Sequence, residues 1–129
     1  MQEHIQNELA SFIANCDWEK IAPHFKEDAA YRVLDWIGCA VAGEHYPQVE
    51  IAQKYFIENG DQGNSTVIGH QTKCSPRTAA FLNGIAGHVC ELDDGHRTAI
   101  GHPGSIAVPT ALALGEHLNA SGADVLKAV

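Results

Sequence analysis

Acidic, histidine and arginine residues are concentrated in one short stretch of the sequence, residues 83–104, between two apolar segments. The residues concerned are Glu91, Asp93, Asp94, His88, His96, His102 and Arg97. Histidine titrates nearest to neutral pH, and a carboxylate can act as a general base or orient a histidine. Each acid alone is more simply explained as a helix cap or a solvated side chain. Their density, on a loop that two helices would hold in place, predicts proton transfer at an active site.

The end of this stretch, His102-Pro103-Gly104-Ser105, has features of its own. A residue before proline is extended, and Gly104 and Ser105 then expose backbone amides at or near a helix start. Free amides at the positive end of a helix dipole bind carboxylates. We therefore predict an anion-binding and acid–base corner here. The alternative is an ordinary turn with an incidental histidine.

The same stretch contains enough potential ligands for zinc or magnesium. Its spacing argues against a metal, because no His-Glu-x-x-His order is present and Arg97 stands where an Asp-Asp-x-x-Asp motif needs its third acid. We predict no metal site. A metal-dependent helical enzyme that uses Asp93 and Asp94 remains the alternative.

The segments on either side have helical periodicity and predict an all-α fold with at most one short strand, at 65–69. Helices are expected over 5–16, 26–43, 47–58, 76–87 and 105–118, and a further one starts at Ser121. Pro109 either kinks the fifth helix or marks its true start. Gly84 and Gly87 lie inside a predicted helix, which indicates that another backbone approaches closely there.

The overall composition is that of a folded protein and excludes several classes of function. The chain has 129 residues, of which 45% are hydrophobic and 19% charged, and its net charge of -8 comes without a basic run that would bind nucleic acid. No membrane span, signal peptide or transit peptide is evident, so we expect a cytoplasmic protein. The four widely spaced cysteines indicate reduced thiols.

Several segments together resemble, in order, the N-terminal part of the MmgE/PrpD family of 2-methylcitrate dehydratases and cis-aconitate decarboxylases. The segments are 34–43, 79–84, 91–94, 102–104 and 121–124. The resemblance implies that residues 1–129 are part of the large helical domain, and that the rest of this domain and the lid domain are absent. Complete members are several times longer and are usually homodimers.

The resemblance also implies the activity: a cofactor-free lyase or isomerase that moves a proton next to a carboxylate of a small di- or tricarboxylate. A hydro-lyase of the 2-methylcitrate dehydratase type is expected first, and cis-aconitate decarboxylation or iminodisuccinate epimerisation are alternatives. By position Glu91, Asp94 and His102 are the expected catalytic residues. The expected substrate contacts are Asp93, His96, Arg97, Thr98, Gly104 and Ser105. The 129-residue chain alone is expected to be inactive, and a non-catalytic helical interaction module is the remaining alternative.

Overall fold

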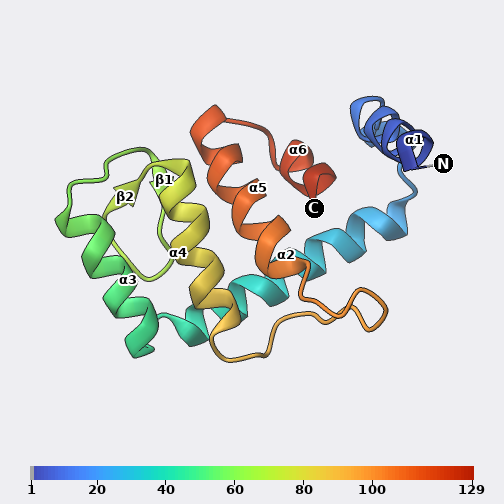
Figure 1. Cartoon of the computed structure of the whole chain (residues 1–129). Helices are drawn as coiled ribbons and strands as arrows, with labels where there is room; N and C mark the ends of the chain where they lie inside the picture. The colour runs from blue at the N-terminus through green and yellow to red at the C-terminus, as the bar shows by residue number, and fades with distance from the viewer. Residues whose placement is uncertain (1) are drawn as a thin grey trace.

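The computed structural model describes the backbone of residues 2–129 and the side chains from His4 onward, and it is mostly helical (Figure 1). The helices are α1 (Gln2–Ala14), a short 3-10 helix η1 (Trp18–Lys20), α2 (Pro23–Gly43), α3 (Pro47–Glu58), α4 (Pro76–His88), α5 (Gly104–Leu118) and α6 (Gly122–Ala128). Two short strands, β1 (Ser65–Thr66) and β2 (Lys73–Cys74), lie between α3 and α4. The predicted all-α fold is confirmed. No helix within residues 2–129 combines the length and the apolar character needed to cross a bilayer.

The helix starts follow the local signals in the sequence. The Ser75 hydroxyl accepts the backbone N–H of Thr78 at the start of α4, and the Ser121 hydroxyl accepts that of Asp124 at the start of α6. α2 begins at Pro23, three residues before the predicted start, because proline is well suited to the first turn of a helix. α5 begins at Gly104, so Pro109 lies inside this helix and does not start it.

Helix α4 packs against both α2 and α5, and small residues allow the close approach. A Cβ atom added at Gly87 would lie 2.6 Å from the ring of Trp36, and one at Gly84 would lie 3.2 Å from the carbonyl oxygen of Ser105. Pro109 has no N–H, so the Ser105 carbonyl lacks its usual helical partner. The predicted close approach of another backbone is confirmed at Gly84, whereas at Gly87 the close neighbour is a side chain, the ring of Trp36. Trp36 itself is buried.

The strand predicted at 65–69 is present, but it pairs with a second strand, β2, that the sequence did not predict. The antiparallel pair places Ser65 opposite Cys74. Two residues from α5 and α4 hold it in place: Glu116 accepts the hydroxyl of Thr66 at 2.7 Å, and the Asn83 amide donates to the Thr66 carbonyl at 2.9 Å. A two-residue strand carries almost no periodicity, so tertiary contacts decide its existence.

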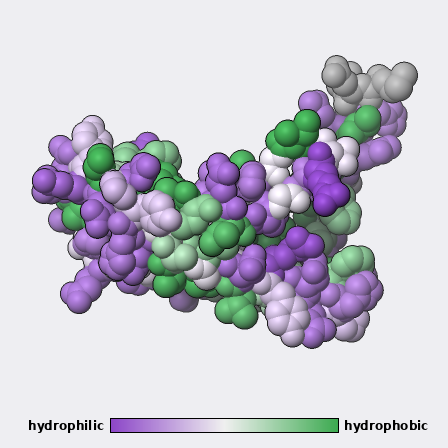
Figure 2. Space-filling view, turned by 90° about the horizontal axis from the view of Figure 1, so that it is seen from below, coloured by the Kyte–Doolittle hydropathy of each residue, from purple (hydrophilic) through white to green (hydrophobic). Residues whose placement is uncertain are grey.

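The predicted amphipathic helix α1 exists, but its apolar face has no cover in the described part of the chain. Ile5, Leu9, Phe12 and Ile13 are each more than half exposed. α1 lies beyond the end of α2 at which the chain enters that helix (Figure 1), and apolar atoms are visible next to the grey N-terminal residues in Figure 2. Tyr31 on α2 is also largely exposed.

Candidate active site

The chain reverses direction after α4 and thereby brings Asp93 back to the end of that helix. α4 ends at His88, and Glu91 has a φ of 50° while its backbone N–H donates to the His88 carbonyl at 2.8 Å. A left-handed residue just past a helix end is a common helix stop, although glycine usually occupies it. The turn places the side chain of Asp93 in the interior, where it has no exposed surface.

Two histidines contact the buried Asp93 carboxylate. Nδ1 of His88 lies 3.0 Å from Oδ1 and 3.2 Å from Oδ2, and Nδ1 of His102 lies 3.4 Å from Oδ1. The two imidazole rings meet edge to face, with centroids 4.7 Å apart. A buried carboxylate is stable only when it is paired, and these imidazoles provide the partners. We call this group the His88–Asp93–His102 cluster.

His102 is the member of the cluster in which a buried ring nitrogen lacks a hydrogen bond. Its side chain is 38% exposed, yet its Nδ1 atom is buried and has no hydrogen-bond partner among the described residues. Asp93 Oδ1 is near that atom, but the contact is long for a hydrogen bond. Catalytic hydrogen bonds are often long in substrate-free structures and shorten when substrate binds.

The cluster could also hold a metal ion. One ligand atom from each of the three residues lies within 4.8 Å of the other two, and two imidazoles with a carboxylate are a donor set that catalytic zinc accepts. The contact between His88 and Asp93 is equally a normal hydrogen bond that needs no ion. The absence of a metal therefore stays a prediction.

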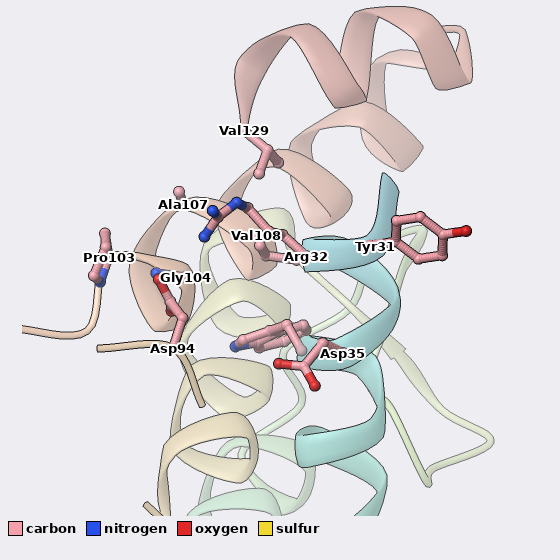
Figure 3. A pocket seen from close by; sticks show the side chains of 10 residues that line it. Tyr31, Arg32, Asp35, Asp94, Pro103, Gly104, Ala107, Val108 and Val129 are labelled. Atoms are coloured by element: carbon pink, nitrogen blue, oxygen red, sulfur yellow. The ribbon is translucent and has the colours of Figure 1, made fainter. Parts of the chain in front are cut away.

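Asp94 is adjacent to Asp93 in sequence but serves a different part of the fold. Its Oδ1 accepts the backbone N–H of Gly104 at 2.8 Å, at the start of α5 (Figure 3). The anion at this helix N-terminus is therefore the protein's own carboxylate, and the Gly104 amide is already occupied. Asp94 also borders a pocket of about 400 Å³ between α2 and α5. We call it the α2–α5 pocket, and its lining residues are Tyr31, Arg32, Asp35, Trp36, Asp94, Pro103, Gly104, Ala107, Val108 and Val129.

The α2–α5 pocket contains a cation that the sequence did not point to, Arg32 (Figure 3). Its Nε donates to Asp28 at 2.7 Å. The hydrogen bond and charge of Asp28 raise the pKa of Arg32, slight burial lowers it, and the charge of Asp94 raises it further. The guanidinium is thus a permanent positive charge beside the pocket. Helical periodicity places Arg32 on a polar face of α2, but only the packing shows that this face meets Asp94.

The segment between Asp94 and His102 folds back on itself and forms a separate surface hollow. The His96 backbone N–H donates to the Gly101 carbonyl at 2.8 Å, and His96 Nδ1 accepts the Ala99 N–H at 3.0 Å. The hollow has a volume of about 400 Å³, and its lining residues are Gly95, His96, Arg97, Ile100, Gly101 and His102. It brings two predicted substrate contacts, His96 and Arg97, next to His102.

The other residues predicted for the site lie outside this hollow. The Ser105 hydroxyl donates to the His102 carbonyl at 2.8 Å, and Ser105 lines a groove between α4 and α5 that also contains His88. Thr98 and Glu91 are exposed, and within the described residues the Glu91 carboxylate makes no hydrogen bond or ion pair. His88 was recognised in the sequence as a titratable residue but not as part of the site. His88 lies at the end of a helix, five residues before Asp93, and this spacing is the sequence signal for adding it to the predicted site.

The buried end of the cluster has a second buried titratable group near it, the thiol of Cys39. Burial, then the charges of Asp35 and Asp93, raise the pKa of the Cys39 thiol. Cys39 is itself buried, and with its raised pKa it stays a neutral thiol at neutral pH. The side chain of Asp93 is likewise buried, so this end of the cluster lies in the protein interior.

Comparison with known proteins shows the family. The family model of the MmgE/PrpD N-terminal domain matches residues 7–129. The cis-aconitate decarboxylase-like protein oryM of Aspergillus oryzae is 31% identical over 113 residues, and human cis-aconitate decarboxylase is 34% identical over 101 residues. The matches cover 88% and 74% of this chain but only 23% and 21% of those proteins, so the chain spans about a quarter of their length. The predicted resemblance is confirmed: this chain belongs to the MmgE/PrpD family.

Proposed function

We propose that the full-length protein is a lyase that moves a proton next to a carboxylate of a small di- or tricarboxylate, and that this chain supplies part of its active site. The observation that carries the proposal is His102. Its ring contacts the buried Asp93 carboxylate and borders the hollow that contains Arg97. An imidazole backed by a buried carboxylate is suited to accept and return a proton.

Dehydration and decarboxylation both need a group that exchanges a proton with the substrate. In a dehydration, a base removes a proton from the carbon next to a carboxylate, the electron pair forms a double bond, and the hydroxyl group leaves with a proton from an acid. In a decarboxylation, a carbon–carboxylate bond breaks, carbon dioxide leaves, and the carbon takes a proton from an acid. His102 fits the group that exchanges the proton, while Glu91 and Asp94 stay the proposed partners in acid–base chemistry.

The surroundings of His102 suit a small anion. A hollow of about 400 Å³ lies within the size range of small-molecule sites. Arg97 lines it and can offset part of the charge of a polycarboxylate on a protein whose net charge is -8. Asp93 reaches a substrate in this geometry only through His102, because its own side chain is fully buried.

The substrate has two main candidates. Dehydration of 2-methylcitrate is the reaction that the sequence predicts first. Decarboxylation of cis-aconitate is the second candidate, and the names of the two relatives favour it. The full-length protein should be assayed for both, by loss of water from 2-methylcitrate and by release of carbon dioxide from cis-aconitate.

The decisive variant is His102→Ala in the full-length protein. Loss of a general acid–base group lowers turnover by roughly 10²- to 10⁴-fold, and the fold should be retained. His4→Ala, on the exposed helix α1, is the matched control and should behave as the unaltered protein. Treatment with a chelator should leave turnover unchanged. Normal turnover by His102→Ala, or no reaction with either substrate, would overturn the proposal.

A further inference from the structure

One carboxylate oxygen of Asp93 lies within reach of both histidines, although His88 and His102 come from segments on either side of the loop. A carboxylate can only accept hydrogen bonds, so a neutral histidine that bonds to it through Nδ1 must carry its proton there. The 3.0 Å contact therefore fixes the proton of neutral His88 on Nδ1. The same reasoning applies to His102 once its 3.4 Å contact shortens.

We propose that Asp93 and His88 are positioning residues for His102, a proposal that rests on the proton-transfer role given to His102 above. Asp93 holds the Nδ1 proton of His102, which leaves Nε2 as the free nitrogen that faces the substrate. When Nε2 accepts a proton in the reaction, the adjacent carboxylate stabilises the resulting imidazolium. The buried and unpartnered Nδ1 of His102 is the atom that this arrangement satisfies.

His88 has a distinct part in the arrangement, because it fixes the rotation of the carboxylate. It contacts both oxygens of Asp93, at 3.0 and 3.2 Å, and so holds Oδ1 toward His102. The backbone of His88 is itself held, since its neighbour Gly87 packs against the ring of Trp36. A rigid helix end thus sets the direction of Asp93, and Asp93 sets that of His102.

The first test reads the proton position directly. Nitrogen NMR of the full-length protein, labelled with 15N-histidine and assigned with His102→Gln, should show neutral His102 protonated on Nδ1. Asp93→Asn should shift His102 toward the form protonated on Nε2, because an amide can donate to Nδ1 where the carboxylate only accepts. Asp61→Asn is the matched control: Asp61 bonds to Ser75 at the opposite end of α4 and should not affect His102.

The second test uses the kinetics of the same variants. Asp93→Asn should lower kcat by about 10²-fold or more and leave KM within a few-fold, since it misplaces the proton without removing a substrate contact. His88→Asn retains a donor near the Nδ1 position and should keep most of the turnover. His88→Leu removes that donor and should lower kcat by up to about 10²-fold.

The outcomes separate this inference from the proposed function. The NMR test needs no substrate, so it decides the positioning role even when neither polycarboxylate reacts. If turnover depends on His102 but Asp93→Asn changes neither kcat nor the proton position, the positioning role is refuted and the function stands. Stoichiometric zinc that is lost in His88→Leu would also refute it. If Asp93→Asn fails to fold, the comparison of His88→Asn with His88→Leu tests the positioning role. Equal kcat values for these two variants would refute it.

Discussion

Asp94 and Gly104, ten residues apart, are joined by a 2.8 Å hydrogen bond from the backbone N–H at the start of α5 to a carboxylate oxygen. The contact is tight, because a Cβ atom at Gly104 would lie 2.2 Å from that oxygen. It stabilises the helix start by occupying an N–H that has no partner within the helix. Asp94 thus has a structural role, as the cap of α5, in addition to the catalytic role proposed for it.

These two parts of Asp94 can be separated by comparing two substitutions. Asp94→Ala should lower the free energy of unfolding by about 1 kcal/mol, the usual effect of losing a helix cap. Asp94→Asn keeps an acceptor oxygen and should retain most of that stability, while it can no longer take up a proton. Urea unfolding of the 129-residue chain measures the stability of the two variants, and turnover of the full-length protein measures the proposed catalytic part, which both substitutions should remove. Asp35→Ala, which removes no hydrogen bond of the described residues, is the control, and an unchanged stability of Asp94→Ala would contradict the capping role.

The packing of α4 on α2 predicts opposite effects at two glycines. Gly87→Ala should destabilise the chain by roughly 1–3 kcal/mol, because the new methyl group meets the ring of Trp36 in a filled core. Gly38→Ala meets nothing within 4 Å and should be neutral or stabilise α2 by up to about 1 kcal/mol. Thermal or urea unfolding of the two variants provides the measurement. Equal effects at both positions would show that α4 does not lie against Trp36.

Glu116 bonds to Thr66 on β1 and to Lys73 on β2, and these contacts predict that stability depends on pH. Burial raises the pKa of Glu116, but hydrogen bonds from Lys73 and Thr66 together outweigh it, and the net pKa is below the ordinary 4.5. The stabilisation is therefore complete above that value and is lost as the pH falls through the lowered pKa. Glu116→Gln should be less stable at pH 7, with a shallower loss of stability between about pH 5 and pH 3.

Urea unfolding at a series of pH values tests this expectation. Glu58→Gln, at an exposed position at the end of α3, is the control for removing one carboxylate from the surface. A difference between Glu116→Gln and the unaltered chain that is the same at every pH would contradict the assigned role of the carboxylate.

The exposed apolar face of α1 predicts self-association of the 129-residue chain. Phe12 is 69% exposed and lies beside Ile5, Leu9 and Ile13 on the same helix. Contiguous apolar surface of this kind associates in water. Phe12→Glu should shift the chain toward monomer in sedimentation or light scattering. Ser11→Glu adds the same charge next to this face without removing an apolar group, and an equal shift in that variant would mean that charge alone is responsible.

The sequence by itself determined the helices and predicted where the chemistry lies. Ser75-Pro76 and Ser121 start helices through bonds to residues three positions away, and such local interactions can be read from neighbouring letters. The glycines of α4 likewise predicted close packing. The concentration of acids and histidines between α4 and α5 pointed to this loop as the candidate site, and the order of matching segments identified the family.

The tertiary structure decided which partners the two neighbouring acids of that loop contact. Asp93 and Asp94 are chemically identical neighbours, yet the turn at Glu91 buries the first beneath two imidazoles and directs the second to the start of α5. The pairing of β1 with β2 and the position of Arg32 beside Asp94 were equally beyond the sequence. In each case the partner lies on a separate element, and the free energy of burying a charge depends on that partner, which no local pattern of residues specifies.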